Sequence, residues 1–314
     1  MTKRGLWLFP SVAASRLVAG AARAEAAGLD EYWLGDEGPA RDPFGVLAAA
    51  AGVTQRIGLG IAITNPYLRH PMITAAQAMT VHELSGGRMT LALGPGGQLA
   101  LGPAGVDRPH PVRAVTEAVK TVRAVASGRP GPGYQPGPEP FTQPDLKVYI
   151  GSRGRAFQRA ASQVADGVFL GGIPLAVLDE VTALARSERD IELAFYIQLA
   201  TTPAAAEELR SGLLWGLADS PAYIHQALDL DPARLGPAAT ALAAGDPAPA
   251  LDLVTPAILE QYALVGSPAQ AGAGLAALAR RYGFTSVGIS AVSPDPLAAV
   301  DAAAELFQAF DQQI

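Results

Sequence analysis

Short apolar runs alternate along the chain with longer runs in which apolar residues recur at helical spacing. Several short runs are apolar on both faces, which is typical of parallel strands covered on each side. The predicted strands span residues 5–9, 31–36, 56–64, 89–94, 147–151, 167–172, 191–201 and 285–292. The predicted helices span residues 14–27, 71–84, 110–127, 154–165, 174–187, 267–282 and 296–311, and one more begins after Pro43.

This alternation of strand and helix indicates an α/β domain with a parallel sheet. The count of predicted strands favours a (β/α)8 TIM barrel, and the main alternative is an open doubly wound sheet. Residues from about 203 to 262 are rich in alanine and proline, have helical spacing and interrupt the alternation before the last strand. We therefore expect one barrel domain over residues 1–314 with a helical insertion at about 203–262.

Composition narrows the classes of function. Of the 314 residues, 49% are hydrophobic and 17% are charged, which excludes disorder and permits a large core. The net charge of −6 argues against a nucleic-acid partner. The chain has no cysteine and its four histidines lack the spacing of metal ligands, so we expect neither thiolate chemistry nor a metal. No apolar run reaches about 18 residues and no signal-peptide pattern is present, which predicts a cytoplasmic protein without a membrane partner.

In a barrel, the residues that follow the strands meet at one mouth, where the active sites of TIM barrels lie. Glycine recurs at these predicted strand ends, at Gly35, Gly94–Gly97, Gly151, Gly154 and Gly171–Gly172. Glycine lets the backbone approach a ligand closely, and few of the neighbouring residues can transfer protons. The G-x-S-x-G motif of α/β-hydrolases is also missing. The pattern favours a bulky, flat cofactor over a hydrolase with a side-chain nucleophile.

The run GSRGRAF at residues 151–157 passes directly from a predicted strand into a helix. Amides at the helix start, together with Arg153 and Arg155, could hold a phosphate. Gly171–Gly172 ends the next strand, where barrels often complete a phosphate site. The alternative is an ordinary turn whose arginines are solvated. The run GPGG at residues 94–97 lacks dinucleotide-binding spacing and is either a loop against a cofactor ring or a simple turn.

Polar residues near strand ends are candidates for acid–base or binding roles. Asp36 and Glu37 end an otherwise apolar strand, where a carboxylate could bind a polar ring edge, transfer a proton or favour the start of a helix. His70 stands at the start of a predicted helix and could reach a site or cap that helix. His82 lies inside an amphipathic helix and is expected to be structural.

The run RIGLGIAITNPYLRHPMITAAQAMTVHELSGGRMTLALGPGG at residues 56–97 closely resembles the luciferase-like flavin and deazaflavin oxidoreductases. It is most similar to their coenzyme F420-dependent branch, which includes methylenetetrahydromethanopterin reductase. Residues 24–37, 148–172 and 262–290 agree in the same order, and TNPYxRHP followed by SGGR is a specific combination. The resemblance implies a bacterial-luciferase-like (β/α)8 barrel in which reduced F420 lies across the mouth and passes a hydride from C5 to a small organic substrate.

The resemblance also assigns residues to the cofactor by position. Asp36 matches an aspartate that contacts the deazaflavin, and Ala62-Ile63 matches a non-proline cis peptide behind the ring. Thr64, the next residue, is also expected at the cofactor, and Asn65 stands where members place a ring-binding polar residue. The remaining expected contacts, in the glycine-rich loop, the phosphate-binding turn and its adjacent loop, are Gly96, Gly97, Gly151, Ser152, Arg153, Gly154, Arg155, Ala156, Phe157, Gly171 and Gly172.

Three departures from the family pattern bear on the chemistry. Glu37 stands where members often have histidine, Gly97 where they often have an acidic residue, and Arg155 where they often have proline. Glu37 is then the first candidate proton donor and His70 the second. Because the first two departures fall near the substrate, we expect reduction of a C=C or C=N bond in a substrate unlike those of the methanopterin and sugar-phosphate members. Family analogy suggests a homodimer.

Two other functions fit the same fold. An FMN-dependent monooxygenase would bind FMN in preference to F420. A barrel without catalysis, acting as a binding protein, would account for the missing groups at positions 37 and 97, and it predicts a trans Ala62-Ile63 bond and no cofactor affinity. The loops that would set the substrate carry no recognisable motif, and they span residues 98–108, 129–146 and 203–262.

Overall fold

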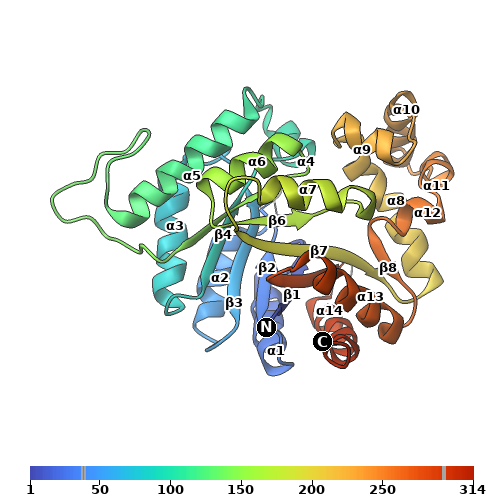
Figure 1. Cartoon of the computed structure of the whole chain (residues 1–314), viewed down its shortest axis with the longest axis horizontal. Helices are drawn as coiled ribbons and strands as arrows, with labels where there is room; N and C mark the ends of the chain where they lie inside the picture. Colours follow the sequence, from blue (N-terminus) through green and yellow to red (C-terminus); the bar gives the residue numbers. More distant parts are fainter. Residues whose placement is uncertain (37, 39, 292–294) are drawn as a thin grey trace.

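Parallel strands close into a barrel in the order β1–β2–β3–β4–β5–β6–β7–β9, and β9 pairs back to β1 (Figure 1). The structure is a computed structural model that describes residues 1–36, 38, 40–291 and 295–314, without the side chains of residues 98, 99 and 291. The barrel strands are β1 (Lys3–Leu8), β2 (Glu31–Leu34), β3 (Gly58–Thr64), β4 (Met89–Leu93), β5 (Lys147–Gly151), β6 (Gly167–Gly171), β7 (Glu192–Ala200) and β9 (Ser286–Ala291). The pairing of β6 with β7 closes the sheet, so the predicted (β/α)8 TIM barrel is confirmed and the open sheet is excluded.

Helices cover the outside of the barrel, and local sequence signals set where several of them begin. They are α1 (Ala14–Ala26), α2 (Pro43–Ala51), α3 (Pro71–Leu84), α5 (Pro111–Ser127), α6 (Arg155–Val164), α7 (Leu178–Ala185, after the 3₁₀ turn η2, Leu175–Val177), α13 (Pro268–Tyr282) and α14 (Pro296–Asp311). The side chains of Asp42, His70 and Ser267 each accept a first-turn amide of the helix that follows. Proline comes next in all three, where its missing N–H costs nothing.

The segment between β7 and α13 forms a separate group of short helices beside the barrel mouth (Figure 1). Its elements are α8 (Pro203–Ala218), α9 (Ala222–Ala227), α10 (Pro232–Ala243), α11 (Ala248–Leu253), α12 (Pro256–Leu259) and the short strand β8 (Ala263–Val265). These elements bury their own apolar cluster, which includes Leu214, Leu217 and Val254. β8 pairs with the end of β7, and this pairing joins the insertion to the barrel.

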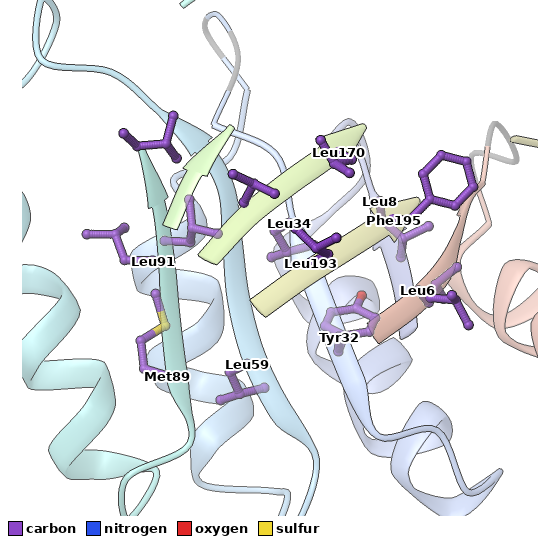
Figure 2. Close-up of a cluster of buried hydrophobic side chains, with 14 of the residues drawn as sticks. Leu6, Leu8, Tyr32, Leu34, Leu59, Met89, Leu91, Leu170, Leu193 and Phe195 are labelled. Atoms are coloured by element: carbon purple, nitrogen blue, oxygen red, sulfur yellow. The ribbon is translucent and has the colours of Figure 1, made fainter. Parts of the chain in front are cut away.

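The strands bury side chains on both faces, and the two faces differ in composition. Aliphatic residues such as Leu34 and Leu91 point outward into the main core under the helices, together with Phe195 (Figure 2). Aromatic residues fill the inside, where Phe169 lies 5.1 Å from Trp33 and 4.7 Å from Tyr196, measured between ring centroids. Each aromatic ring needs a small residue opposite. A Cβ on Gly60 would lie 2.2 Å from the Trp33 ring, so glycine there makes room for the indole.

A buried carboxylate closes the amino-terminal end of the barrel. Glu31 is 5% exposed, and its Oε2 accepts hydrogen bonds from Trp33 Nε1 at 2.9 Å, Tyr196 OH at 3.1 Å and Ser286 Oγ at 2.7 Å. Its Oε1 pairs with Lys3 Nζ at 3.0 Å. The network connects β1, β2, β7 and β9 below the aromatic layer.

The sequence prediction missed the shortest elements. α4 (Gln98–Leu101), the 3₁₀ turn η1 (Gly102–Ala104) and β8 each have three or four residues, which is too few to show a period. The predicted strand over 285–292 ends at a residue outside the described part of the chain. The other predicted strands agree with the structure to within two residues at each end, which is the usual spread of element boundaries.

Candidate functional site

A cavity of about 930 Å³ opens at the carboxyl ends of the barrel strands. Many of the residues predicted to bind the cofactor line it, and they are Ala62, Ile63, Gly96, Gly97, Gly151, Ser152, Arg153, Gly154, Phe157, Gly171 and Gly172. They come from the ends of β3, β4, β5 and β6, which barrel closure brings to one mouth. The insertion supplies the facing wall through α8 and the turn that follows it.

One wall of the cavity depends on glycine. A Cβ at Gly94 would lie 2.2 Å from Ile63 Cδ1 and 2.3 Å from the Gly151 carbonyl oxygen, and a Cβ at Gly151 would lie 2.3 Å from Ile63 Cγ2. Glycine at both positions therefore leaves room for Ile63. The Ala62-Ile63 peptide bond is cis, as the resemblance implies, whereas the non-catalytic alternative predicted a trans bond. Trp7 Nε1 donates to the Ala62 carbonyl at 2.6 Å.

The turn between β5 and α6 has the geometry of an anion site. Gly154 is the N-cap of α6, no side chain caps this helix among the described residues, and the Gly154 amide donates to Ser152 Oγ at 3.2 Å. The amides of Phe157 and Gln158 bond to the Gly154 carbonyl at 3.0 and 3.3 Å. The amides of the first two helical residues have no acceptor within the helix, which is how helix N-termini bind anions. Gly172, with φ 64°, lies in the adjacent loop.

Arg153 lines the cavity, but its guanidinium bonds to the end of α8. Its Nη1 donates to the Gly216 carbonyl and, at 2.8 Å, to Ser220 Oγ. Its Nη2 donates to the Asp219 carbonyl at 3.2 Å and lies 3.6 Å from that residue's carboxylate. A cation at the carboxyl end of a helix is favoured by the helix dipole. Arg153 therefore fastens the insertion to the β5–α6 turn.

The side chains of Arg155 and Ala156 lie outside the cavity lining. Arg155 Nε pairs with Glu180 Oε1 at 2.5 Å, and its guanidinium carbon lies 4.1 Å from the centre of the Tyr223 ring. Tyr223 in turn donates its hydroxyl hydrogen to the Arg153 carbonyl. At these two positions the backbone amides at the start of α6, rather than the side chains, are the groups available to an anion, and binding of a phosphate there stays a prediction.

Asp36 and Thr64 are joined by one arginine. Arg69 Nη1 lies 2.5 Å from Asp36 Oδ2 and 3.1 Å from Thr64 Oγ1, and its guanidinium carbon lies 4.9 Å from the centre of the Phe44 ring. Neither Asp36 nor Thr64 lines the cavity. The arginine holds the ends of β2 and β3 together, and a contact between Asp36 and a cofactor stays a prediction.

Asn65 supports the glycine-rich loop from behind. It is 2% exposed, and its Oδ1 accepts the amides of Tyr67 at 3.1 Å and Leu68 at 3.0 Å. A Cβ at Gly96, whose φ is 70°, would lie 3.3 Å from Asn65 Cβ and Cγ. Asn65 therefore shapes the turn after β3 and backs Gly96, and its side chain is outside the cavity lining.

Of the two candidates for proton transfer, the structure describes His70 but not Glu37. His70 caps α3, because its Nδ1 accepts the Met72 amide at 3.2 Å, and its ring is outside the cavity lining. This is the capping role that the sequence left open. Glu37 lies outside the described residues. His82 is 1% exposed with Nδ1 3.3 Å from the Met89 carbonyl, so it is structural, as expected.

Sequence reasoning missed an ion pair at the rim of the cavity. Arg108 Nη1 donates to the Gly96 carbonyl at 2.6 Å, and its Nη2 lies 3.4 Å from Asp219 Oδ1. Asp219 thus lies between Arg108 and Arg153 and links the loop after β4 to the insertion. Arg108 and Asp219 lie in a loop and at a helix end without a motif, so no local signal marks them, and the motif that contains Arg153 does not indicate this pairing.

Two buried polar atoms at the β7 side of the cavity have no hydrogen-bond partner among the described residues. They are Gln198 Oε1 and the Tyr262 hydroxyl, and both residues line the cavity. The two residues are neighbours, because the Gln198 amide donates to the Tyr262 carbonyl at 3.1 Å. A buried polar group without a partner costs free energy, so these atoms point to a ligand with polar edges. Gln198 interrupts an apolar predicted strand, a signal that could have been used, whereas nothing in the local sequence marks Tyr262.

The chemistry offered by the described cavity residues is binding rather than nucleophilic attack. The only carboxylate among them, Asp219, is paired with two arginines, and no histidine is present. Within the part of the chain that the structure describes, no cluster of three or more potential metal ligands occurs, and no helix has both the length and the apolar character of a membrane span.

Comparison with known proteins identifies the family. The chain is 27% identical to the 5,10-methylenetetrahydromethanopterin reductase of Methanolobus tindarius over 282 residues, which cover 84% of this chain and 86% of the relative. A solved structure described as a coenzyme F420 dependent tetrahydromethanopterin reductase from Methanopyrus kandleri has a TM-score of 0.81 at 24% identity, covering 96% of this chain and 97% of that one. An F420-dependent secondary alcohol dehydrogenase in complex with an F420-acetone adduct has a TM-score of 0.72 at 18% identity, covering 99% of each chain.

These likenesses agree with the resemblance inferred from the sequence motifs, and the two structures share the barrel fold. The sequence profile of the family described as luciferase-like monooxygenase matches residues 1–286, which is most of the chain. The protein therefore belongs to the luciferase-like monooxygenase family.

Proposed function

We propose that the protein is an F420-dependent oxidoreductase whose cofactor occupies the cavity at the carboxyl end of the barrel. The observation that carries the proposal is the construction of this cavity. It combines a glycine-backed wall at Ile63, an anion-type turn at Gly151–Gly154 and an aromatic floor, while its charged side chains are already paired. Such a site can position a flat, phosphorylated cofactor and leave the chemistry to it. The similarity to a coenzyme F420 dependent tetrahydromethanopterin reductase and to an F420-dependent secondary alcohol dehydrogenase supports F420 as that cofactor.

The residues present fit such a group. The unpartnered Gln198 Oε1 and Tyr262 hydroxyl match a ligand with polar groups, and the absence of a Cβ at Gly94 and Gly151 lets Ile63 take its place in the cavity wall. Residues 62–63, 96–97, 151–154 and 171–172 would hold the cofactor. When bound in its reduced form, F420 supplies a hydride from C5. The barrel residues bind and orient it, and α8 of the insertion, with the turn that follows, forms the facing wall of the site.

The substrate proposed is a small organic molecule with a C=C or C=N bond. The lining outside the predicted cofactor positions is largely apolar and includes Trp7, Leu213 and Trp215. The charged side chains that line the cavity, Arg108, Arg153 and Asp219, are paired with one another and leave a net charge of only +1, so a neutral substrate is favoured over a strongly charged one. Glu37 remains the first proposed proton donor. A homodimer and a cytoplasmic location remain predictions.

The experiment that tests the proposal is a titration of the purified protein with oxidised F420 and, separately, with FMN, followed by tryptophan fluorescence. Tighter binding of F420 is expected, because the family resemblance is to the deazaflavin branch. Preference for FMN together with oxygen uptake in the presence of reduced flavin would favour the monooxygenase. Binding of neither cofactor would contradict both enzymatic functions and leave the binding protein.

A glycine variant ties the binding to this cavity. Gly151→Ala places a Cβ 2.3 Å from Ile63 Cγ2, so Ile63 must shift and F420 binding should weaken about tenfold or more. Gly137→Ala is the matched control, because a Cβ there meets nothing within 4 Å. Equal F420 affinity in the two variants would contradict the placement of the cofactor against Ile63.

A further inference from the structure

The anion-type turn between β5 and α6 lacks a charged side chain of its own. Arg153 donates to the Gly216 and Asp219 carbonyls and to Ser220, and Arg155 pairs with Glu180. An anion at the start of α6 would therefore depend on neutral donors. The first-turn amides of α6 are two of them, and a helix of this length has a dipole that favours a negative group there.

Tyr262 provides a further donor at the same cavity. The residue is 5% exposed and its hydroxyl has no partner among the described residues. Gln261, just before it, accepts the amides of Leu175 and Ala176 at 2.9 and 2.8 Å, which docks this segment on the loop after β6. That loop also contains Gly172, which lines the cavity beside the β5–α6 turn.

The electrostatic surroundings of Tyr262 agree with this location. Burial raises the pKa of the Tyr262 hydroxyl, and the nearby positive charge of Arg153 opposes that rise. The hydroxyl therefore stays protonated at neutral pH and can donate a hydrogen bond. A phenolic donor that is buried and unpaired in the free protein gains a partner when an anion enters, which is the condition for a strong contribution to binding.

We infer that Tyr262, contributed by the insertion, binds the phosphate of the cofactor together with the first-turn amides of α6. This inference rests on the proposed function, since it requires a phosphorylated flavin or deazaflavin in the cavity. Arg153 then acts as a positioning residue that holds the insertion against the turn. The phosphate is bound by hydrogen-bond donors rather than by a free cation.

The test compares ligands with and without the phosphate; FMN and riboflavin differ in that group alone, whereas F420 differs from its deazaflavin core by the phosphate and the tail attached to it. Wild type and Tyr262→Phe are titrated with FMN and riboflavin, and with F420 and its phosphate-free deazaflavin core. The variant should bind FMN or F420 about 10- to 100-fold more weakly, as expected for a lost hydrogen bond to a charged group, and should bind the phosphate-free ligand as wild type does. Equal weakening for both members of a pair would place the hydroxyl on the ring and overturn the inference, as would unchanged affinity for both.

Two further measurements keep the outcomes distinct. Tyr134→Phe is the control, because Tyr134 is outside the cavity lining, and its affinities should match wild type. The melting temperature of unliganded Tyr262→Phe should be at least that of wild type, because the variant removes a buried hydroxyl without a partner. A lower melting temperature would assign the hydroxyl a structural partner and overturn the inference. Failure of the wild-type protein to bind any of the four ligands would instead contradict the proposed function.

Discussion

The buried carboxylate of Glu31 allows a stability prediction to be worked out from the structure. Glu31→Gln keeps the shape of the side chain and removes its charge. The amide oxygen can still face Trp33, Tyr196 and Ser286, which now donate to Glu31 Oε2 at 2.7 to 3.1 Å. The amide nitrogen then faces Lys3, whose side chain is 53% exposed and can turn to water.

The expected loss follows from the change in acceptor. Hydrogen bonds to a charged group contribute about 1.5–3 kcal/mol and those between neutral groups about 0.5–1.5 kcal/mol. The difference is about 1–1.5 kcal/mol per bond, so three such bonds lose about 3–4.5 kcal/mol in total. The neutral amide is less costly to bury than a carboxylate, which offsets part of this loss. We expect the free energy of unfolding to fall by about 2 kcal/mol.

Urea unfolding followed by tryptophan fluorescence measures this change, because the Trp33 indole donates to Glu31. The control is Glu117→Gln, which removes a carboxylate that pairs with Arg113 on the exposed face of α5, and it should unfold with the wild-type midpoint. A Glu31→Gln protein with the midpoint and slope of wild type would refute the reasoning. It would mean that the charge-assisted bonds only balance the cost of burying the carboxylate.

Two other changes test the insertion and the pH dependence. Arg153→Met removes the hydrogen bonds between residue 153 and the end of α8. Amide hydrogen exchange within residues 203–262 should then become about 10- to 100-fold faster, while the amides of the barrel strands keep their protection. Unchanged exchange in the insertion would contradict the role of Arg153 in holding the insertion to the β5–α6 turn. The pKa of Glu192 is lowered, because hydrogen bonds from Lys147 and Tyr149 outweigh the effect of burial, which raises it. A lowered pKa in the folded state stabilises the protein at pH values above the unfolded-state pKa of about 4.5, and this stabilisation is lost as the pH falls through the folded-state pKa. The stability of Glu192→Gln should therefore depend less on pH below about pH 4.5 than that of wild type. Identical acid-unfolding profiles of the two proteins would contradict this.

The sequence by itself determined the elements of the barrel. The spacing of apolar residues and the residue types that begin or end an element are local properties of the sequence. Apolar runs therefore predicted the strands, and His70 followed by Pro71 predicted that α3 begins at Pro71, as it does in the structure. The glycines at the predicted strand ends also indicated where the cavity lies. A position where the backbone comes close to another group has no room for a Cβ, and this restricts the residue type to glycine whichever group is close.

Only the tertiary structure decided which side chains meet. Arg153 was predicted beside a phosphate, but its guanidinium bonds to residues 63 to 67 positions later, because the insertion folds back over the β5–α6 turn. Gln198 and Tyr262 are neighbours because of the pairing at the end of β7. Glu31 meets Tyr196 and Ser286 only because β7 and β9 close the barrel against β1. Hydrophobic period carries no information about such pairs, since partners distant in sequence are selected by barrel closure and by the docking of the insertion rather than by local conformation.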